Sequence, residues 1–166
     1  DSSSVELINS MFKGSSSLEE IYFGNFKTSK VTDMSHMFHD CQNLKSLDLS
    51  SFDTSKVNEI SYMFFRCKKI KALDLSNFDT SKVTHMGRVF QECSSLEYLD
   101  LSNLNTLNLW NFLFYDNTEY MFEGVDSLKY FNLYTAQIYS INFKDQIDSM
   151  VKYTTIVCQK YEIIRN

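Results

Sequence analysis

Several features that identify enzymes or nucleic-acid-binding proteins are missing from the 166-residue sequence. It contains only four glycines and no glycine loop that could cradle a phosphate, and it contains no nucleophile motif. Its 16 basic residues are scattered and its net charge is -5, whereas a nucleic-acid groove needs a stripe of basic side chains. The sequence therefore predicts a protein that is not an enzyme and does not bind nucleic acid.

Long apolar segments are missing as well. No apolar run approaches the ~20 residues that cross a bilayer, so the sequence predicts no membrane-spanning segment. No charged segment followed by an apolar one precedes the first repeat, as it would in a signal peptide. Because the chain begins with Asp1 and not with methionine, we expect it to be a processed or excised piece.

Metal-binding motifs are also missing. Cys41, Cys67 and Cys93 recur every 26 residues, without the C-x-x-C spacing of most zinc sites. Free cysteine is among the most buried residue types, so this spacing favours a column of small buried side chains over a metal site or disulfides. Cys158 has no obvious partner, and the three histidines share no spacing with acids or thiols. The sequence predicts neither a metal nor any other cofactor.

What the sequence does contain is a 26-residue repeat. Its clearest copy extends from Phe52 to Ser76, and the copies before and after it restate the Thr-Ser-Lys-Val and Leu-Asp-Leu-Ser groups. A fixed period of this length is the signature of a stacked array. One copy alone buries too little apolar surface to offset the entropy of ordering its residues, so neighbouring copies must stabilise one another.

Each copy changes its apolar period internally. After the N-cap candidates at 53–55, apolar residues stand at 57, 60, 63, 64 and 67, which is the spacing of one face of a short helix. The pattern then alternates around Leu73 and Leu75, which predicts a short half-buried strand. The predicted fold is an α/β solenoid: a right-handed leucine-rich-repeat coil of short helices and short parallel strands, with about five coils and a C-terminal cap.

Two parts of the chain depart from the repeat. Six residues are inserted near 106–120, because Met121 follows Val89 by 32 residues instead of 26. The aromatic residues of this insertion, including Trp110, either pad a longer helix against the core or form a protruding loop that contacts a ligand. From residue 135 the repeat is gone, so we predict a repeat domain at 1–134, with an atypical first copy, and a C-terminal cap at 135–166.

The repeated residues resemble a known family. The group Leu44-Lys45-Ser46-Leu47-Asp48-Leu49-Ser50 has the leucine-rich-repeat form L-x-x-L-x-L. More narrowly, the pattern F-D-T-S-K-V-T-x-M-x-x-M-F-x-x-C-x-x-L-x-x-L-D-L-S is similar to that of the BspA-like surface proteins of bacteria, including many mycoplasma lipoproteins. The resemblance covers about residues 11–134. It departs from the usual leucine-rich repeat where phenylalanine replaces the buried asparagine that follows the strand.

The solvent face of the expected sheet carries the candidate binding residues. One column at the repeat spacing consists of Asp48, Asp74, Asp100 and Asn132, and a second changes from Ser46 and Ala72 to Tyr98 and Tyr130. The acidic column either receives cationic groups or accepts hydrogen bonds from its own strand ends, and the second reading is favoured. Tyrosine provides contact area with few torsions to freeze, as binding surfaces favour. The alternative is that these tyrosines pack against the insertion.

Three functions remain open from the sequence. The leading hypothesis is a binding module that contacts a protein or glycan partner through Tyr98, Tyr130, Tyr134, Asp74, Asp100 and Trp110. The BspA-like resemblance implies a surface or secreted bacterial protein, used in adhesion or host interaction. A structural spacer of a larger surface protein needs only the repeats and the cap. An enzyme would need the polar cluster of the insertion: Tyr115, Asp116, Glu119 and Glu123.

Overall fold

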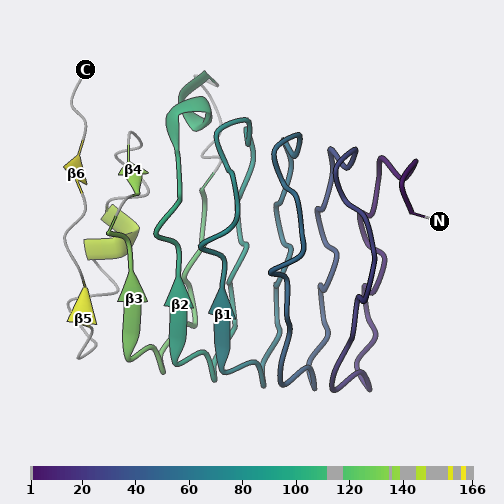
Figure 1. The fold of residues 1–166 in the computed structure, drawn as a ribbon. Helices are drawn as coiled ribbons and strands as arrows, with labels where there is room; N and C mark the ends of the chain where they lie inside the picture. Colours follow the sequence, from purple (N-terminus) through teal and green to yellow (C-terminus); the bar gives the residue numbers. More distant parts are fainter. Residues whose placement is uncertain are drawn as a thin grey trace.

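The repeats lie side by side in chain order in the computed structural model, which describes residues 2–111, 118–134, 136–138, 145–148, 157–158 and 162–163 (Figure 1). Three neighbouring repeats each contribute one short strand to a parallel sheet: β1 (Ala72–Asp74), β2 (Tyr98–Asp100) and β3 (Tyr130–Asn132). Beyond β3 the sheet is extended by β5 (Val157–Cys158). A second parallel pair consists of β4 (Gln137–Ile138) and β6 (Glu162–Ile163).

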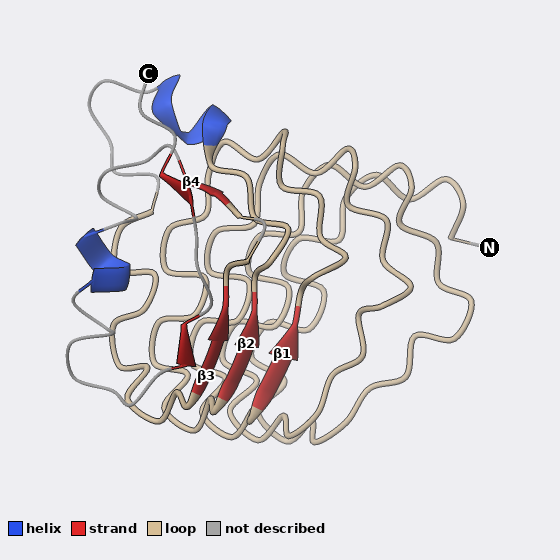
Figure 2. Cartoon of the chain, turned by 60° about the vertical axis from the view of Figure 1, so that its left-hand side comes forward, coloured by secondary structure: helices blue, strands red, loops and turns tan. Residues whose placement is uncertain are grey.

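The predicted α/β leucine-rich-repeat solenoid, with a short helix in every coil, is wrong. Within the described residues, helical geometry is confined to the 3-10 helix η1 (Leu107–Asn111) and to residues 145–148. The segments predicted as helices, such as 57–67, consist of turns and irregular backbone (Figure 2). The sheet is also smaller than predicted, because its repeat-derived strands are only three residues long and begin at Ala72.

Backbone hydrogen bonding explains why residues 57–67 do not form a helix. The amides of Met63, Phe65 and Cys67 donate to the carbonyls three residues earlier, as in successive β-turns. The amides between them, at 60, 62, 64 and 66, donate instead to the carbonyls of residues 85, 87, 89 and 91 in the next repeat. An α-helix would use each of these amides for a carbonyl four residues earlier, so bonding between the repeats excludes the helix.

In the clearest copy of the repeat, the apolar positions predicted to face inward are nevertheless all buried. In the clearest copy and the phenylalanine after it, none is more than 7% exposed: Val57, Ile60, Met63, Phe64, Cys67, Ile70, Leu73, Leu75 and Phe78. At one of these positions the rings of successive repeats stack into what we call the phenylalanine ladder. Phe64 lies 5.7 Å from Phe38 and 5.9 Å from Phe90 between ring centroids, with nearly parallel planes. Phe12 and Phe122 continue the ladder at its two ends.

The cysteine column is confirmed as a buried structural feature. Cys41, Cys67 and Cys93 are fully buried and unoxidised, and each thiol donates a hydrogen bond to a carbonyl of the preceding repeat. In the middle of the column, the Sγ atom of Cys67 lies 3.2 Å from the carbonyl oxygen of Phe38. Burial raises the pKa of Cys41 to about 11 and that of Cys93 to about 12. These thiols therefore stay protonated at neutral pH.

Two backbone positions in each repeat adopt the left-handed conformation that favours glycine. The first column is Ser10, His36, Tyr62, Arg88 and Tyr120, and the second is Gly14, Asp40, Arg66, Glu92 and Gly124. A residue other than glycine pays roughly 1–2 kcal/mol for this conformation. The central repeats have residues other than glycine at both positions. The first and last repeats have glycine, Gly14 and Gly124, at the second position.

Substitution of these two glycines should separate backbone strain from crowding. Gly14 and Gly124 have nearly the same φ, 74° and 73°. A Cβ atom at Gly14 would meet nothing within 4 Å, but at Gly124 it would lie 3.3 Å from the Cα atom of Glu92. We expect Gly14→Ala to lower the free energy of unfolding by about 1 kcal/mol and Gly124→Ala to lower it further, as measured by urea denaturation. If both variants lost the same free energy of unfolding, the predicted contact between a Cβ atom at position 124 and Glu92 would be contradicted.

The C-terminal part of the chain is described in pieces. β5 pairs with β3 at the end of the sheet, as expected of a cap that covers exposed strand edges. Most of the insertion, residues 112–117, lies outside the described residues, although Leu109 in η1 is buried in the core. The boundary between a repeat domain at 1–134 and a cap at 135–166 stays a prediction. In the ranges that the structure describes, no helical segment has the length and apolar character needed to cross a membrane.

Candidate binding site on the sheet face

The three strands of the repeats place the candidate residues on one surface, which we call the sheet face. The central residue of each strand points into the core: Leu73, Leu99 and Phe131 are all buried. Side chains alternate along a strand, so the residues on either side of each central residue point outward. The strand register aligns Ala72 with Tyr98 and Tyr130, and Asp74 with Asp100 and Asn132. Both predicted columns therefore exist in these three repeats.

Tyr98 and Tyr130 form a stacked pair on this face. Their ring centroids are 4.7 Å apart and their planes differ by 2°, which follows from the spacing of paired strands. Both side chains are partly exposed. Burial, followed by the nearby carboxylates of Asp100 and Asp74, raises the pKa of the Tyr98 hydroxyl above its usual value. The Tyr98 hydroxyl therefore stays protonated at physiological pH, and the two parallel rings form a flat aromatic surface.

The two candidate aspartates differ in their surroundings. Asp100 is only 7% exposed, and its carboxylate accepts hydrogen bonds from the amide of Ser102, the side chain of Asn132 and the hydroxyl of Tyr98. Asp74 is exposed, and its Oδ1 atom accepts a hydrogen bond from the amide of Ser76 at 3.0 Å. The carboxylate of Asp100 is therefore used for bonds within the protein. The carboxylate of Asp74 is open to solvent and can contact a partner.

The acidic column also has a structural role. In successive repeats Asp48, Asp74 and Asp100 each accept a hydrogen bond from the amide two residues later, which fixes the turn after the strand position. The serine hydroxyl and amide that donate to Asp48 lower the pKa of this carboxyl. These contacts agree with the reading that each aspartate bonds to its own strand end, and they leave the second carboxylate oxygen of Asp74 available.

The remaining candidates lie apart from the pair or outside the described side chains. Tyr134 is 65% exposed, and its amide bonds to the side chain of Asn132 at 3.0 Å, just beyond β3. Trp110 lies in η1, where its backbone is described but its side chain is not. The structure therefore brings together Tyr98, Tyr130, Asp74 and Asp100, and the Trp110 prediction lies outside the described side chains.

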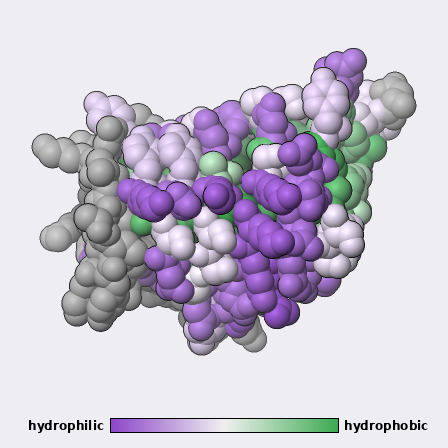
Figure 3. All heavy atoms as spheres, turned by 90° about the horizontal axis from the view of Figure 1, so that it is seen from below, coloured by the Kyte–Doolittle hydropathy of each residue, from purple (hydrophilic) through white to green (hydrophobic). Residues whose placement is uncertain are grey.

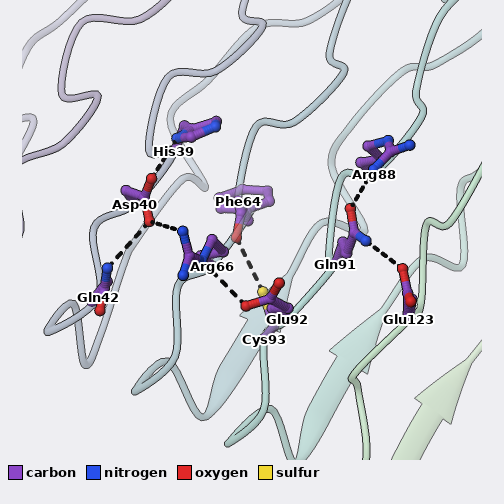
Figure 4. Close-up of polar contacts among 10 residues, drawn as sticks. All are labelled: His39, Asp40, Gln42, Phe64, Arg66, Arg88, Gln91, Glu92, Cys93 and Glu123. Carbon is purple, nitrogen blue, oxygen red and sulfur yellow. Dashed lines mark hydrogen bonds and ion pairs between the residues drawn. The ribbon is translucent and has the colours of Figure 1, made fainter.

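A second polar arrangement, which the sequence analysis missed, follows the turns that replaced the predicted helices. Here Arg66 lies between two acids of the neighbouring repeats, 3.5 Å from Asp40 and 3.2 Å from Glu92 (Figure 4). We call these three residues the charged ladder. Next to it the amide of Gln91 bonds to Glu123. These charges are paired within the protein, so little is left for a partner to neutralise.

Arg88 stacks on aromatic rings beside the charged ladder. Its guanidinium carbon lies 4.5 Å from the ring centroid of Tyr120 and 5.8 Å from that of Tyr62, and an N–H group lies 3.8 Å from Glu119. Successive repeats therefore place His36, Tyr62, Arg88 and Tyr120 in one column, in which each side chain contacts the next. The sequence showed these residue types at the repeat spacing. It could not show that their side chains stack.

Metal-binding clusters are not found among the residues that the structure describes. No group of three or more histidine, cysteine or acidic side chains there could hold a metal ion. Of the polar cluster suggested for an enzyme, Tyr115 and Asp116 lie outside the described residues. Glu119 faces Arg88, and Glu123 accepts a hydrogen bond from Gln91.

The end of the molecule at which the chain turns before each strand is polar. It carries residues such as Asn43, Lys68 and Lys69, which lie in turns at the repeat spacing. Seen from that end, hydrophilic side chains cover most of the described surface, and hydrophobic residues are confined to a narrow part of it (Figure 3). This end of the molecule therefore offers a partner mainly polar groups.

Comparison with known protein families identifies the family of the repeats. The family described as "Mycoplasma protein of unknown function, DUF285" matches residues 1–98 and, a second time, residues 48–161. The overlapping matches agree with the internal repeat. No curated protein and no solved structure matches the chain.

Proposed function

The chain belongs to the Mycoplasma protein family of unknown function DUF285, and from this premise we propose that it is a non-enzymatic binding module. It binds a protein partner through the sheet face. The observation that supports this function is the parallel stacking of Tyr98 and Tyr130 beside the exposed carboxylate of Asp74. Interfaces are enriched in rigid aromatic anchors of this kind, and exposed aromatic clusters are rare on surfaces without a function.

We further propose that the module belongs to a surface protein of the BspA-like type. The resemblance of the repeat to mycoplasma lipoproteins supports this narrower assignment, and membership of a Mycoplasma family is consistent with it. Such a protein is anchored or secreted and presents its repeats to other cells or to the host. Adhesion or host interaction is the corresponding biological role.

Substitution of both tyrosines tests the binding face. We expect Tyr98→Ser combined with Tyr130→Ser to weaken binding to an immobilised panel of purified extracellular-matrix proteins by about tenfold or more, because two aromatic anchors are lost. Biolayer interferometry with the intact chain provides the measurement. The matched control is Tyr120→Ser, which removes an equally large, 46% exposed ring from a different face and should leave binding unchanged.

The same experiment separates the proposal from a structural spacer. A spacer needs only the stacked repeats, so the unmodified chain would bind no member of the panel. Binding that persists in the double variant, with the variant folded as judged by urea denaturation, would contradict the sheet face as the binding surface.

A further inference from the structure

The stack of tyrosines on the sheet face is open at one end. Tyr98 is covered on one ring face by Tyr130, and on its other side the strand register pairs it with Ala72. Ala72 is exposed and carries only a methyl group, which cannot cover a phenol ring one strand away, at ~4.8 Å. Among the described residues, the stack therefore ends in a free aromatic face above Ala72, with room for one more planar group.

The charge beside this free face is negative. Asp74 lies two residues along the same strand from Ala72 and is exposed on the same side. None of the ion pairs formed among the described residues includes Asp74. The charged ladder shows the opposite case, because Arg66 there neutralises acids of two neighbouring repeats. An unpaired carboxylate next to a free ring face favours a planar cation.

The protein itself contains such an arrangement elsewhere. Arg88 occupies one position of an aromatic column, with its guanidinium 4.5 Å from the ring centroid of Tyr120 and a carboxylate of Glu119 nearby. Guanidinium groups stack on tyrosine faces and pair with carboxylates in a fixed plane, which an ammonium group cannot do. The repeat spacing thus suits a guanidinium that continues a column of tyrosines.

We propose that the space above Ala72 binds the guanidinium of an arginine side chain of a partner protein, stacked on Tyr98 and paired with Asp74. This proposal rests on the proposed function and names the chemistry that the sheet face recognises. A neutral sugar ring could also stack on Tyr98 but would leave the charge of Asp74 unpaired. The charge therefore favours an arginine-bearing polypeptide over a glycan.

A titration followed by NMR tests the proposal on the intact chain. The probes are N-acetyl-L-arginine amide, its lysine counterpart and methyl β-D-glucopyranoside, and the signals observed are those of the Tyr98 ring. We expect the arginine probe alone to shift these signals in a saturable way. In Asp74→Asn the affinity should fall about two- to fivefold, as expected for an exposed ion pair. Ala72→Tyr should abolish the response by extending the stack, whereas Ala72→Ser, which copies Ser46, should keep it.

A second measurement uses an arginine of the protein itself to fill the space above Ala72. Ala72→Arg places a guanidinium on the adjacent strand, where it can reach Tyr98 and Asp74, and should raise the thermal unfolding midpoint above that of the matched Ala72→Lys variant. Equal midpoints, or equal responses to the arginine and lysine probes, would overturn the proposal. A response to the glucoside alone would also overturn it and indicate a sugar-binding face. In that case the proposed binding function would still hold and only its ligand would change. If the chain bound no member of the matrix-protein panel, the proposed binding function itself would be contradicted.

Discussion

Replacing Phe64 by alanine is expected to lower the free energy of unfolding by about 3–5 kcal/mol, the usual loss for a buried phenylalanine. Phe64 is 0% exposed and stacks on Phe38 and Phe90 at once, so its removal leaves a cavity between two repeats. Each repeat is stabilised by its neighbours, and a gap in the middle of the phenylalanine ladder weakens two such contacts. Because domains are stable by only about 5–15 kcal/mol, the midpoint of urea denaturation should shift substantially.

The matched control is the same substitution at the end of the ladder. Phe12 is only half-buried, and within the ladder it stacks on Phe38 alone. Phe12→Ala should therefore cost clearly less than Phe64→Ala in the same measurement. If both variants lost the same free energy of unfolding, the number of neighbouring rings that each phenylalanine contacts would not determine its contribution to stability.

The burial pattern could be predicted from the sequence because it depends only on side-chain hydrophobicity and on the period. Apolar residues recurring every 26 positions must face the same way in every copy, whatever backbone connects them. Cys67 and Met63 are therefore buried as expected, and so are their counterparts in the two neighbouring repeats, Cys41, Cys93, Met37 and Val89, whereas Met11 in the first copy is 44% exposed. The strands at 72–74 and 98–100 also follow from the alternating pattern.

The helices could not be predicted correctly because their apolar spacing is ambiguous. Residues 60, 63, 64 and 67 face the core in a helix, and they also do so in a chain of β-turns that bonds to the next repeat. The choice between the two depends on long-range hydrogen bonds such as that from Phe64 to Val89, which a local pattern does not encode. The left-handed backbone at Tyr62 and Arg66 is the local consequence.

The candidate site could be predicted in part. The repeat period placed Tyr98 beside Tyr130 and Asp74 beside Asp100, and the register of the sheet confirms both alignments. The period gives no information on which aspartate is buried, because that depends on the larger neighbours that each repeat acquires. Asp100 is covered through bonds to Asn132 and Tyr98, whereas Asp74 has an alanine, Ala72, at the position that Tyr98 occupies beside Asp100, and it stays exposed.

The cysteine column makes the stability of the protein sensitive to alkaline pH. Burial raises the pKa of Cys41 to about 11, of Cys93 to about 12, and of Cys67 well above its usual range. In the unfolded chain these thiols titrate near pH ~8.5. At pH values below this, both states keep their protons and the contribution of the thiols to stability is fully present. Above it, the unfolded state loses protons that the folded state retains, so stability falls as the pH rises.

We expect the free energy of unfolding to fall between pH 9 and pH 10 by up to ~4 kcal/mol, which is ~1.4 kcal/mol per pH unit for each of three thiols. Urea denaturation in the presence of a reductant, at pH 7, 8, 9 and 10, gives the slope. The same slope is measured for the Cys67→Ala variant. Lysines, tyrosines and the other thiols contribute equally to the slope in both proteins, so the difference between the two slopes belongs to Cys67. Removing one of the three buried thiols should reduce the thiol part of the slope by about one third, whatever the variant loses in stability at pH 7. An unchanged slope would mean that the thiolate of Cys67 is tolerated in the core, and that its burial does not control its protonation.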